Sequence, residues 1–289
     1  MKIIRFLTLI LGLIIVPMVH GQGMTDQKRL ERAKQLLAAE NHLPPSDSVW
    51  IEELTYMEVR DHIAKGVTTA IIPTGGIEEN GPYLATGKHN YILRAICPVI
   101  ARELGNALCA PIVQFVPEGD LDPPGNLRFI PGTFSVRDET YKALLDDIAT
   151  SLKLHGFKDI IFLGDSGGNQ RGMGEVVKEL NLRWAQSDVK AHFIIEFYTP
   201  GWEDTERYTE EVLGIVEPQN DGHHDDIWVT ALMMVTDPSS VRYQQRIDKN
   251  LATINGVDIS NLDEIVELGR KMAEYRGQKA ADIIRERIN

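Results

Sequence analysis

The sequence TTAIIPTGGIEENGPYLATGKH, residues 68–89, joins a short apolar segment to a long polar loop. Its first five residues are all apolar or β-branched, which is typical of a buried strand. A capping box formed by Thr55 and Glu58 opens a helix that we expect to end near Ala64, just before this strand. The segment therefore predicts a helix-to-strand unit of a parallel sheet.

The same alternation of helix and strand repeats along the chain. We expect helices at residues 25–40, 91–104, 138–155, 170–184, 227–235 and 262–288, and strands at residues 110–116, 159–163 and 191–198. Because parallel strands need crossover connections of this kind, the sequence predicts the α/β class: a three-layer sandwich with a mainly parallel central sheet flanked by helices. We assign residues 50–289 to a single domain, preceded by an N-terminal helix and linker at residues 22–49.

The N-terminus has the composition of a secretory signal peptide. Lys2 and Arg5 precede the apolar run Phe6–Val16. This run of eleven residues is shorter than the roughly 20 that a membrane-spanning helix needs. We therefore expect cleavage before Gln22, which removes the signal peptide 1–21 and makes the protein secreted or periplasmic, with no membrane attachment after processing. An uncleaved anchor or a buried N-terminal helix is the alternative.

Charge and cysteine content narrow the function classes. The 30 Lys and Arg residues against 42 Asp and Glu residues give a net charge of −12, and no basic stripe interrupts this balance. Nucleic acids and anionic membrane surfaces are therefore poor candidate partners. Cys97 and Cys109 are the only cysteines, which excludes a disulfide framework, and their apolar surroundings favour two buried free thiols over a bridge.

Potential metal ligands follow the predicted strands. Glu78 and His89 lie in the loop after residues 68–72, and Asp165 follows residues 159–163. Ligands of open α/β sheets bind beyond the carboxyl ends of the strands, and carboxylate and imidazole groups bind divalent metals. The sequence therefore predicts a shared site for these three side chains. The structural alternatives are a solvated loop charge at Glu78, a capping or core role for His89 and a helix cap at Asp165.

Two further segments are distinguished by their composition. The Pro- and Gly-rich stretch 117–132 is a long irregular loop, and loops of that length usually cover a site or bind something. The cluster DGHHDD, residues 221–226, precedes a predicted helix. His223 is a candidate proton carrier because imidazole titrates near neutrality. The aspartates of the cluster are equally suited to complement the helix dipole.

The order of these motifs resembles that of the creatininase (creatinine amidohydrolase) family. Four motifs carry the resemblance: a P-x-G-x-x-E-x-x-G-P-x-L frame, a P-G-T tripeptide, a G-G-N turn and a late histidine. The matching residues are Pro73, Gly75, Glu78, Gly81, Pro82, Leu84, Pro131, Gly132, Thr133, Gly167, Gly168, Asn169 and His223. The resemblance implies the family's fold, an amidohydrolase acting on C–N bonds other than peptide bonds, and a homo-oligomer.

The resemblance also implies site residues, several of which are changed here. The first metal-binding Glu of the family falls on Glu78, and its base-like His falls on His223 with Asp226 in place of a Glu. The carboxylate that bridges two metals in the family falls on His89, and Asp165 is a carboxylate that the family usually lacks. Histidines of the family fall on Asn80, Tyr83 and Ser166.

These changes alter the expected metal content. A carboxylate can bridge two cations, whereas a neutral imidazole normally offers one nitrogen to one metal. We therefore expect one divalent metal cation per chain (Zn, Mn or Fe), held by Glu78, His89 and Asp165.

Together, these features predict a secreted metal-dependent hydrolase of a non-peptide or cyclic amide, with His223 and Asp226 as catalytic residues. The residues expected to line its pocket for a small amide or lactam substrate are Asn80, Tyr83, Ser166, Asn169, His224 and Asp225. Two alternatives stay open. One is a binding protein that kept the fold and lost the chemistry, and the other is a serine hydrolase in which His223 activates Ser166.

Overall fold

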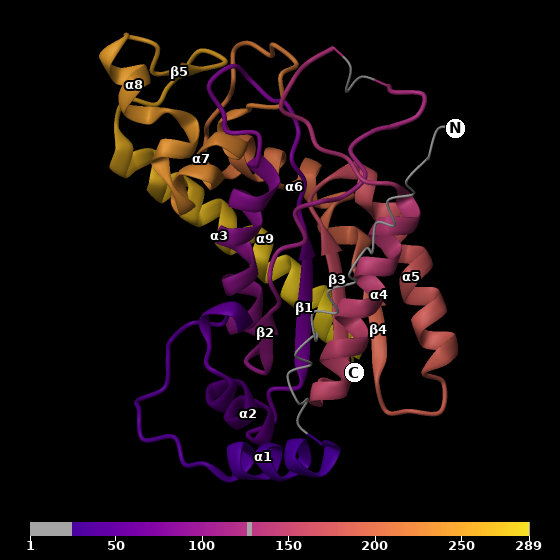
Figure 1. Ribbon diagram of the computed structural model, residues 1–289. Coiled ribbons are helices and arrows are strands. Elements are labelled where there is room, and N and C mark those ends of the chain that lie inside the picture. Colours follow the sequence, from indigo (N-terminus) through magenta and orange to yellow (C-terminus); the bar gives the residue numbers. More distant parts are fainter. Residues whose placement is uncertain (1–24, 126–128, 289) are drawn as a thin grey trace, which may run out of the picture. The chain divides into compact units, whose positions relative to one another are not determined.

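The computed structural model describes residues 25–125 and 129–288 (Figure 1). The predicted signal peptide, residues 1–21, lies outside the described residues. A boundary between His42 and Leu43 divides the chain into two units. The first contains helix α1 (Asp26–Ala38), whose first turn is capped because the side chain of Thr25 accepts the N–H of Lys28. Among the described residues, no helix is long and apolar enough to cross a lipid bilayer.

The second unit is built on a four-stranded sheet with the order β2-β1-β3-β4, in which every pairing is parallel. The strands are β1 (Thr69–Thr74), β2 (Ala107–Cys109), β3 (Asp159–Gly164) and β4 (Lys190–Phe193). All six residues of β1 are buried, as its uninterrupted apolar and β-branched sequence predicted. The parallel α/β fold is therefore confirmed.

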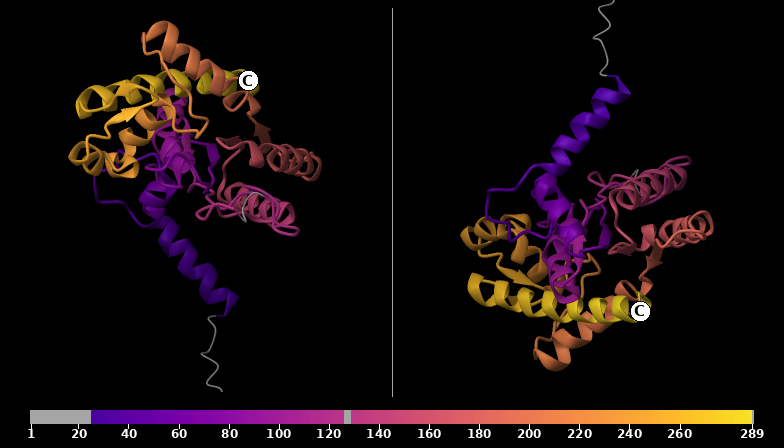
Figure 2. Two further views of the ribbon diagram at one scale, coloured as in Figure 1. Left: turned by 90° about the horizontal axis from the view of Figure 1, so that it is seen from above. Right: turned by 90° about the horizontal axis from the view of Figure 1, so that it is seen from below.

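Helices cover both faces of the sheet, because alternate residues of each strand point to opposite faces. Ile71 and Ile161 belong to a core shared with α3 (Lys88–Leu104), α7 (Ile227–Thr236) and α9 (Leu262–Ile288). Ile72 and Phe162 belong to a second core shared with α4 (Asp138–His155) and α5 (Gln170–Arg183). Figure 2 shows the long helix α9 and the pair α4 and α5 on opposite sides of the strands, which gives the three layers.

Some element boundaries differ from those that the sequence predicts. The capping box of Thr55 and Glu58 is present and opens α2 (Tyr56–Ala64). The second strand ends at Cys109 instead of extending over residues 110–116, and β4 is shorter than residues 191–198. The elements that the sequence did not predict are α6 (Gly201–Arg207), a π-helical segment (Tyr208–Val212), α8 (Tyr243–Asp248), the hairpin of β5 (Thr253–Ile254) and β6 (Val257–Asp258), and 3-10 turns at Ile51–Glu53, Gly167–Asn169, Ile195–Phe197 and Pro238–Val241.

The expectation of two free thiols is wrong, because Cys97 and Cys109 form a disulfide. Cys97 lies in α3 and Cys109 ends β2, and the packing of this helix against this strand brings the two Cα atoms to 6.3 Å. That separation lies within the range that a disulfide spans. The sequence showed that each cysteine is buried, but only the tertiary packing shows that they face each other.

Candidate metal centre

The site forms where two neighbouring strands end. Strands β1 and β3 pair as far as Thr74 and Gly164, and the backbone N–H of Asp165 donates to the carbonyl of Thr74 at 3.0 Å. The chain leaves both strands at the same edge of the sheet, so the loop after β1, which carries Glu78, lies close to Asp165. Helix α3 begins at Lys88, three residues before the predicted start, which places His89 in its first turn.

His89 is the centre of the cluster. Its Nδ1 lies 2.8 Å from Oδ2 of Asp165, and its Nε2 lies 2.9 Å from Oε1 of Glu78. The imidazole is buried, with 2% of its residue surface exposed. Burial lowers the pKa of the His89 imidazole, but the hydrogen bonds to Asp165 and Glu78 outweigh it and raise the pKa. Without a metal ion, both ring nitrogens therefore donate to carboxylate oxygens.

Each of the two carboxylates also has a buried cation. The Nζ atom of Lys88 lies 2.8 Å from Oε1 of Glu78, and Nη1 of Arg276 lies 2.8 Å from Oδ1 of Asp165. Arg276 comes from α9 and also donates to the carbonyl of Phe197 at 2.9 Å. The charges therefore form a continuous chain in the order Lys88, Glu78, His89, Asp165, Arg276.

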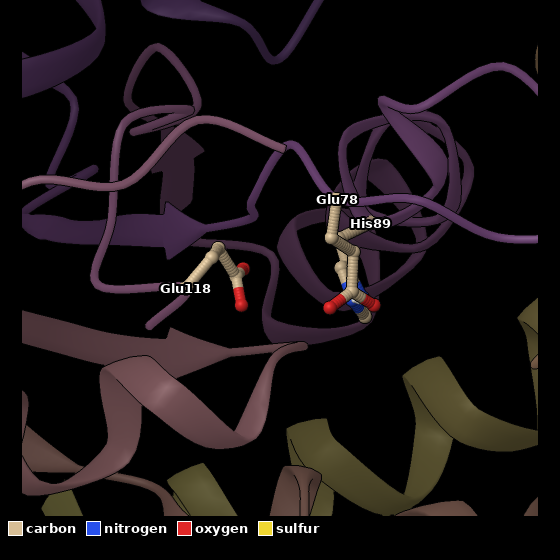
Figure 3. Close-up of side chains that lie close together, drawn as sticks. All are labelled: Glu78, His89 and Glu118. Atoms are coloured by element: carbon tan, nitrogen blue, oxygen red, sulfur yellow. Dashed lines mark hydrogen bonds and ion pairs between the residues drawn. The ribbon is translucent and has the colours of Figure 1, made fainter. Parts of the chain in front are cut away.

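Glu118 adds a third metal donor. Donor atoms of Glu78, His89 and Glu118 lie within 4.8 Å of one another, and Figure 3 shows the Glu118 carboxylate directed toward the other two side chains. Its Oε2 accepts a hydrogen bond from Oγ of Ser166 at 2.9 Å. Its Oε1 is buried and has no hydrogen-bond partner among the described residues. This oxygen is therefore available to a ligand.

Two glycines make room for the segment that carries Glu118. A Cβ atom at Gly76 would lie 1.9 Å from Oε1 of Glu118, and one at Gly168 would lie 1.9 Å from the carbonyl oxygen of Pro117. Both distances are far shorter than a van der Waals contact. A side chain at Gly168 would therefore collide with backbone, and one at Gly76 would displace the Glu118 carboxylate. The G-G-N turn thus lets the 117–118 segment approach the site.

Burial and neighbouring charges shift the pKa values of Glu78 and Glu118 in opposite directions. Burial raises the pKa of Glu78, but the hydrogen bond to His89 and the charge of Lys88 outweigh it and lower the pKa to about 2. Burial and the negative charge of Glu78 raise the pKa of Glu118 to about 7. Glu78 is thus a permanent carboxylate, whereas Glu118 exchanges a proton near neutral pH.

The donor set fits a divalent cation. Two carboxylates and one imidazole are the ligands that Zn, Mn and Fe share, and the unpartnered Oε1 of Glu118 provides an open donor. Asp165 supports His89 from behind, as carboxylates commonly do for metal-binding histidines. Both oxygens of Asp165 are engaged by His89 and Arg276, whereas the donor atoms of Glu78, His89 and Glu118 converge. The role of Asp165 as a direct metal ligand stays a prediction.

Three of the predicted pocket residues hold the loops of the site together. The side-chain amide of Asn169 donates to the carbonyls of Thr74 and Gly75 at 3.1 and 3.0 Å, and that of Asn80 donates to the carbonyl of Glu78 at 2.9 Å. Ser166 is 4% exposed, and its hydroxyl is bonded to Glu118. Its partner is therefore a carboxylate, and the pairing with His223 that a serine nucleophile needs is not formed.

The other predicted residues are not part of the donor group of Glu78, His89 and Glu118. His223 and His224 are exposed and line a separate cavity of about 420 Å³ together with Glu79, Asn80, Pro82, Ile130 and Gly222. Asp225 packs against Gly81, and Asp226 directly precedes α7. Tyr83 is 39% exposed, beneath the guanidinium of Arg246. Within the described chain, no hydrogen bond or ion pair joins His223 to Glu78, His89 or Glu118.

Sequence reasoning missed Glu118, Lys88 and Arg276. The irregular loop 117–132 was a signal for Glu118, since a loop of that length was expected to cover a site. Lys88 is adjacent to a predicted ligand, but a lysine has no metal-binding role. Arg276 lies in the middle of a predicted helix, where nothing in the sequence indicates that it reaches a carboxylate on the sheet.

Comparison with known proteins agrees with the motif order. The profile of a family described as "Creatininase: Creatinine amidohydrolase" matches residues 52–277. A curated relative, creatinine amidohydrolase of Pseudomonas putida, is 26% identical over 226 residues, covering 75% of this chain and 83% of the relative.

Solved structures agree in fold. A creatinine amidohydrolase (creatininase) superposes with a TM-score of 0.62 at 22% identity, covering 84% of this chain and 99% of that one. A structure described as "Creatininase Mn" gives 0.61 at 21% identity, and a mutant creatininase described as "Zn-Zn type" gives 0.59 at 22% identity, both with the same coverage. On the family match and the shared architecture, this chain belongs to the creatininase family of amidohydrolases.

Proposed function

We propose that this protein hydrolyses the C–N bond of a non-peptide or cyclic amide with the help of one divalent cation held by Glu78, His89 and Glu118. The observation that carries the proposal is the convergence of these three side chains within 4.8 Å at the carboxyl edge of the sheet. Membership in a family of amidohydrolases supports the reaction class. The Mn and Zn-Zn creatininase structures support the choice of metal.

The residues of the site have separate tasks in this proposal. A bound divalent cation would polarise the substrate carbonyl and lower the pKa of water. Glu78 stays ionised because its pKa is about 2, and Asp165 holds the His89 ring so that a cation could replace the proton between Nε2 and Glu78. Glu118, whose pKa is about 7 in the ion-free site, would bind the cation through one oxygen and pass a proton to the leaving nitrogen through the other. Ser166 orients Glu118 by donating to its Oε2.

The substrate is proposed to be a small amide or lactam. The relative is named for creatinine, which makes that cyclic amide the first compound to test. We do not expect creatinine to be the best substrate, because Asn80 and Ser166 replace two histidines around the site. The role of His223 stays a prediction, and Glu118 is the better-placed proton carrier because it lies among the donors.

A metal-dependence experiment tests the reaction class. Protein reconstituted with Zn²⁺ or Mn²⁺ should hydrolyse at least one member of an amide and lactam panel, and chelation should abolish that activity. His89→Ala should remove both metal and activity. Glu118→Gln should lower kcat on the order of 10²-fold or more, the size expected for a lost proton carrier. Glu139→Gln, an exposed change on α4, is the control.

Two outcomes would favour the alternatives. Activity that survives chelation and is blocked by a fluorophosphonate would favour a serine hydrolase using Ser166. Tight binding of a panel member without turnover would favour a binding protein that lost the chemistry.

We also propose export and self-association. The charged start and short apolar run at residues 1–21 support a secreted or periplasmic protein, and N-terminal sequencing should find Gln22 first. A mature protein that retains Met1 would contradict export. The family resemblance supports a homo-oligomer, which light scattering of the purified protein measures directly.

A further inference from the structure

The cluster around His89 contains one lysine and one arginine side chain, neither of which is a metal ligand. Lys88 is 0% exposed and Arg276 is 3% exposed, so both charged groups are removed from water. Burial of a charge is costly unless a partner compensates it. Each cation has one carboxylate partner at 2.8 Å, and these two carboxylates are the ones that flank His89.

The position of Lys88 bears directly on metal binding. Oε1 of Glu78 is shared between Nζ of Lys88 at 2.8 Å and Nε2 of His89 at 2.9 Å. The ammonium thus lies against the same carboxylate oxygen that faces the imidazole donor. It makes no other hydrogen bond among the described residues, so neutralising Glu78 is its main electrostatic role.

The surroundings hold Lys88 in this place. The residue lies in the first turn of α3, and its ammonium is 5.8 Å from the centre of the Trp202 ring, which also packs 6.0 Å from the His89 ring. The side chain has no surface exposed to solvent. It therefore acts as a fixed internal charge.

The fixed charges of the cluster cancel without any ion. Glu78 and Asp165 contribute two negative charges, and Lys88 and Arg276 contribute two positive charges. A first divalent cation would take the place of the proton on Nε2 of His89, which faces Glu78, and could use the ionised form of Glu118. A second divalent cation would need more negative charge, and it would meet an ammonium already paired with Glu78.

We infer that the ammonium of Lys88 is a built-in cation that takes the place of a second metal ion and restricts this site to one. This inference rests on the proposed function only in assuming that the donors bind metal. It contrasts with the creatininase structure described as Zn-Zn type, and it adds one side chain of this protein to the ligand changes at Asn80, His89 and Ser166.

The test is metal binding by the purified full-length protein, with Zn²⁺ and Mn²⁺ as probes and with no activity assay. Protein stripped with a chelator is dialysed against each metal, its metal content is measured, and the affinity is obtained by calorimetry. The variants are Lys88→Met, which keeps the length and removes the charge, and Lys88→Arg, which keeps the charge. Lys142→Met, which removes a partly exposed lysine from α4, is the matched control.

The wild type should bind about one equivalent per chain. Lys88→Met should bind the first equivalent on the order of tenfold more tightly or better, because a nearby positive charge is gone, and it should take up part of a second equivalent. Metal should also raise its Tm by more than it raises the Tm of the wild type, since the ion would compensate Glu78. Lys88→Arg and Lys142→Met should behave as the wild type does.

Two results would overturn the inference: two tightly bound equivalents in the wild type, or a Lys88→Met variant with unchanged affinity and stoichiometry. If Lys88→Met unfolds without metal and is refolded by metal, the inference is supported, because the ion then replaces the ammonium. If it unfolds under both conditions, the stoichiometry of the wild type decides alone.

The same measurements separate this inference from the proposed function. A wild type that binds two ions and hydrolyses amides would overturn the role of Lys88 and leave the amidohydrolase intact. A wild type that binds no ion, with a Lys88→Met variant that binds one, would remove the metal-dependent mechanism and support Lys88 as the replacement for a metal.

Discussion

The loop after β1 and the segment before α7 both carry residues that match the family motifs, yet the structure holds them differently. The first is fixed from several directions: Asn169 donates to the carbonyls of Thr74 and Gly75, and Asn90 donates to the carbonyl of Gly76 at 3.0 Å. The second has mainly local bonds, such as the N–H of His223 to Oδ1 of Asp221 at 2.9 Å.

The difference shows what a motif match can and cannot establish. Glu78 and His89 become a donor pair because buried bonds from β3, α3 and α9 fix their positions. His223 has the right side chain for proton transfer, but it is exposed, and no hydrogen bond or ion pair of the described residues joins it to the donors. Position in a motif therefore indicates function only where buried interactions orient the side chain.

The largest expected loss of stability comes from breaking the buried ion pair between Asp165 and Arg276. Arg276→Met leaves the carboxylate of Asp165 buried without its main counter-charge, which should cost about 3–5 kcal/mol of unfolding free energy. Urea denaturation followed by circular dichroism measures it. Arg270→Met, on the exposed side of the same helix, should change the unfolding free energy by less than about 1 kcal/mol. Equal effects of the two changes would show that the Asp165–Arg276 pair does not stabilise the site.

A smaller effect is expected where the 117–118 segment approaches the G-G-N turn. Gly168→Ala would place a Cβ atom against the backbone carbonyl of Pro117, which cannot move without displacing Glu118. We expect a loss of about 1–3 kcal/mol in unfolding free energy, as for other overpacked sites, together with weaker binding of Zn²⁺. Gly125→Ala is the control, since its nearest neighbour would be 3.9 Å away. Unchanged Zn²⁺ affinity in Gly168→Ala would separate Glu118 from the metal site.

In the segment before α7, Glu217 should make the unfolding free energy depend on pH. Burial and the nearby charges of Asp226 and Asp225 raise the pKa of Glu217 to about 7 from its ordinary 4.5. The folded protein keeps this proton up to about pH 7, whereas the unfolded chain releases it near pH 4.5, so the unfolding free energy falls as pH rises across that window. Glu217→Gln keeps an oxygen that can accept the N–H of Ile227 and should flatten this slope.

The size of this effect is limited because Glu217 is only half-buried. After allowance for solvent screening, we expect a change on the order of 1 kcal/mol between pH 4.5 and pH 7. Thermal melts at several pH values compare the variant with the wild type. Glu267→Gln, an exposed change on α9, should leave the slope as it is, and parallel curves for Glu217→Gln and the wild type would contradict the prediction.

The sequence predicted the fold better than the site, for physical reasons. Helices 138–155 and 262–288 were placed correctly because their periodic apolar residues are a local signal. The meeting of Glu78 and Asp165 followed from parallel strands that end at one edge. The disulfide and the contribution of Arg276 depend on which helix packs on which strand, and no local pattern contains that information.

Glu118 lies outside the four motifs that resemble the family, so the motifs did not predict it. Ser166 stands at a position where the family motif has a histidine. The structure supplies a carboxylate from a different segment, with Ser166 as its hydrogen-bond donor at 2.9 Å. Ser166 thus lies beside a carboxylate that is 48 residues away in sequence.

The smallest expected effect is that of His223→Ala. The side chain is exposed, and its removal should change the unfolding free energy by no more than about 0.5 kcal/mol, as for most surface positions. Because no bond joins it to the donors, Zn²⁺ affinity should stay equal to that of the wild type, in contrast to the loss expected for His89→Ala. Its effect on kcat discriminates between two possibilities. If the loop stays as the structure shows it, kcat changes little, and Glu118 carries the proton. If kcat falls on the order of 10²-fold or more while Zn²⁺ affinity is retained, substrate binding must bring the 221–226 loop to the site, and His223 is then the proton carrier that the motif predicted.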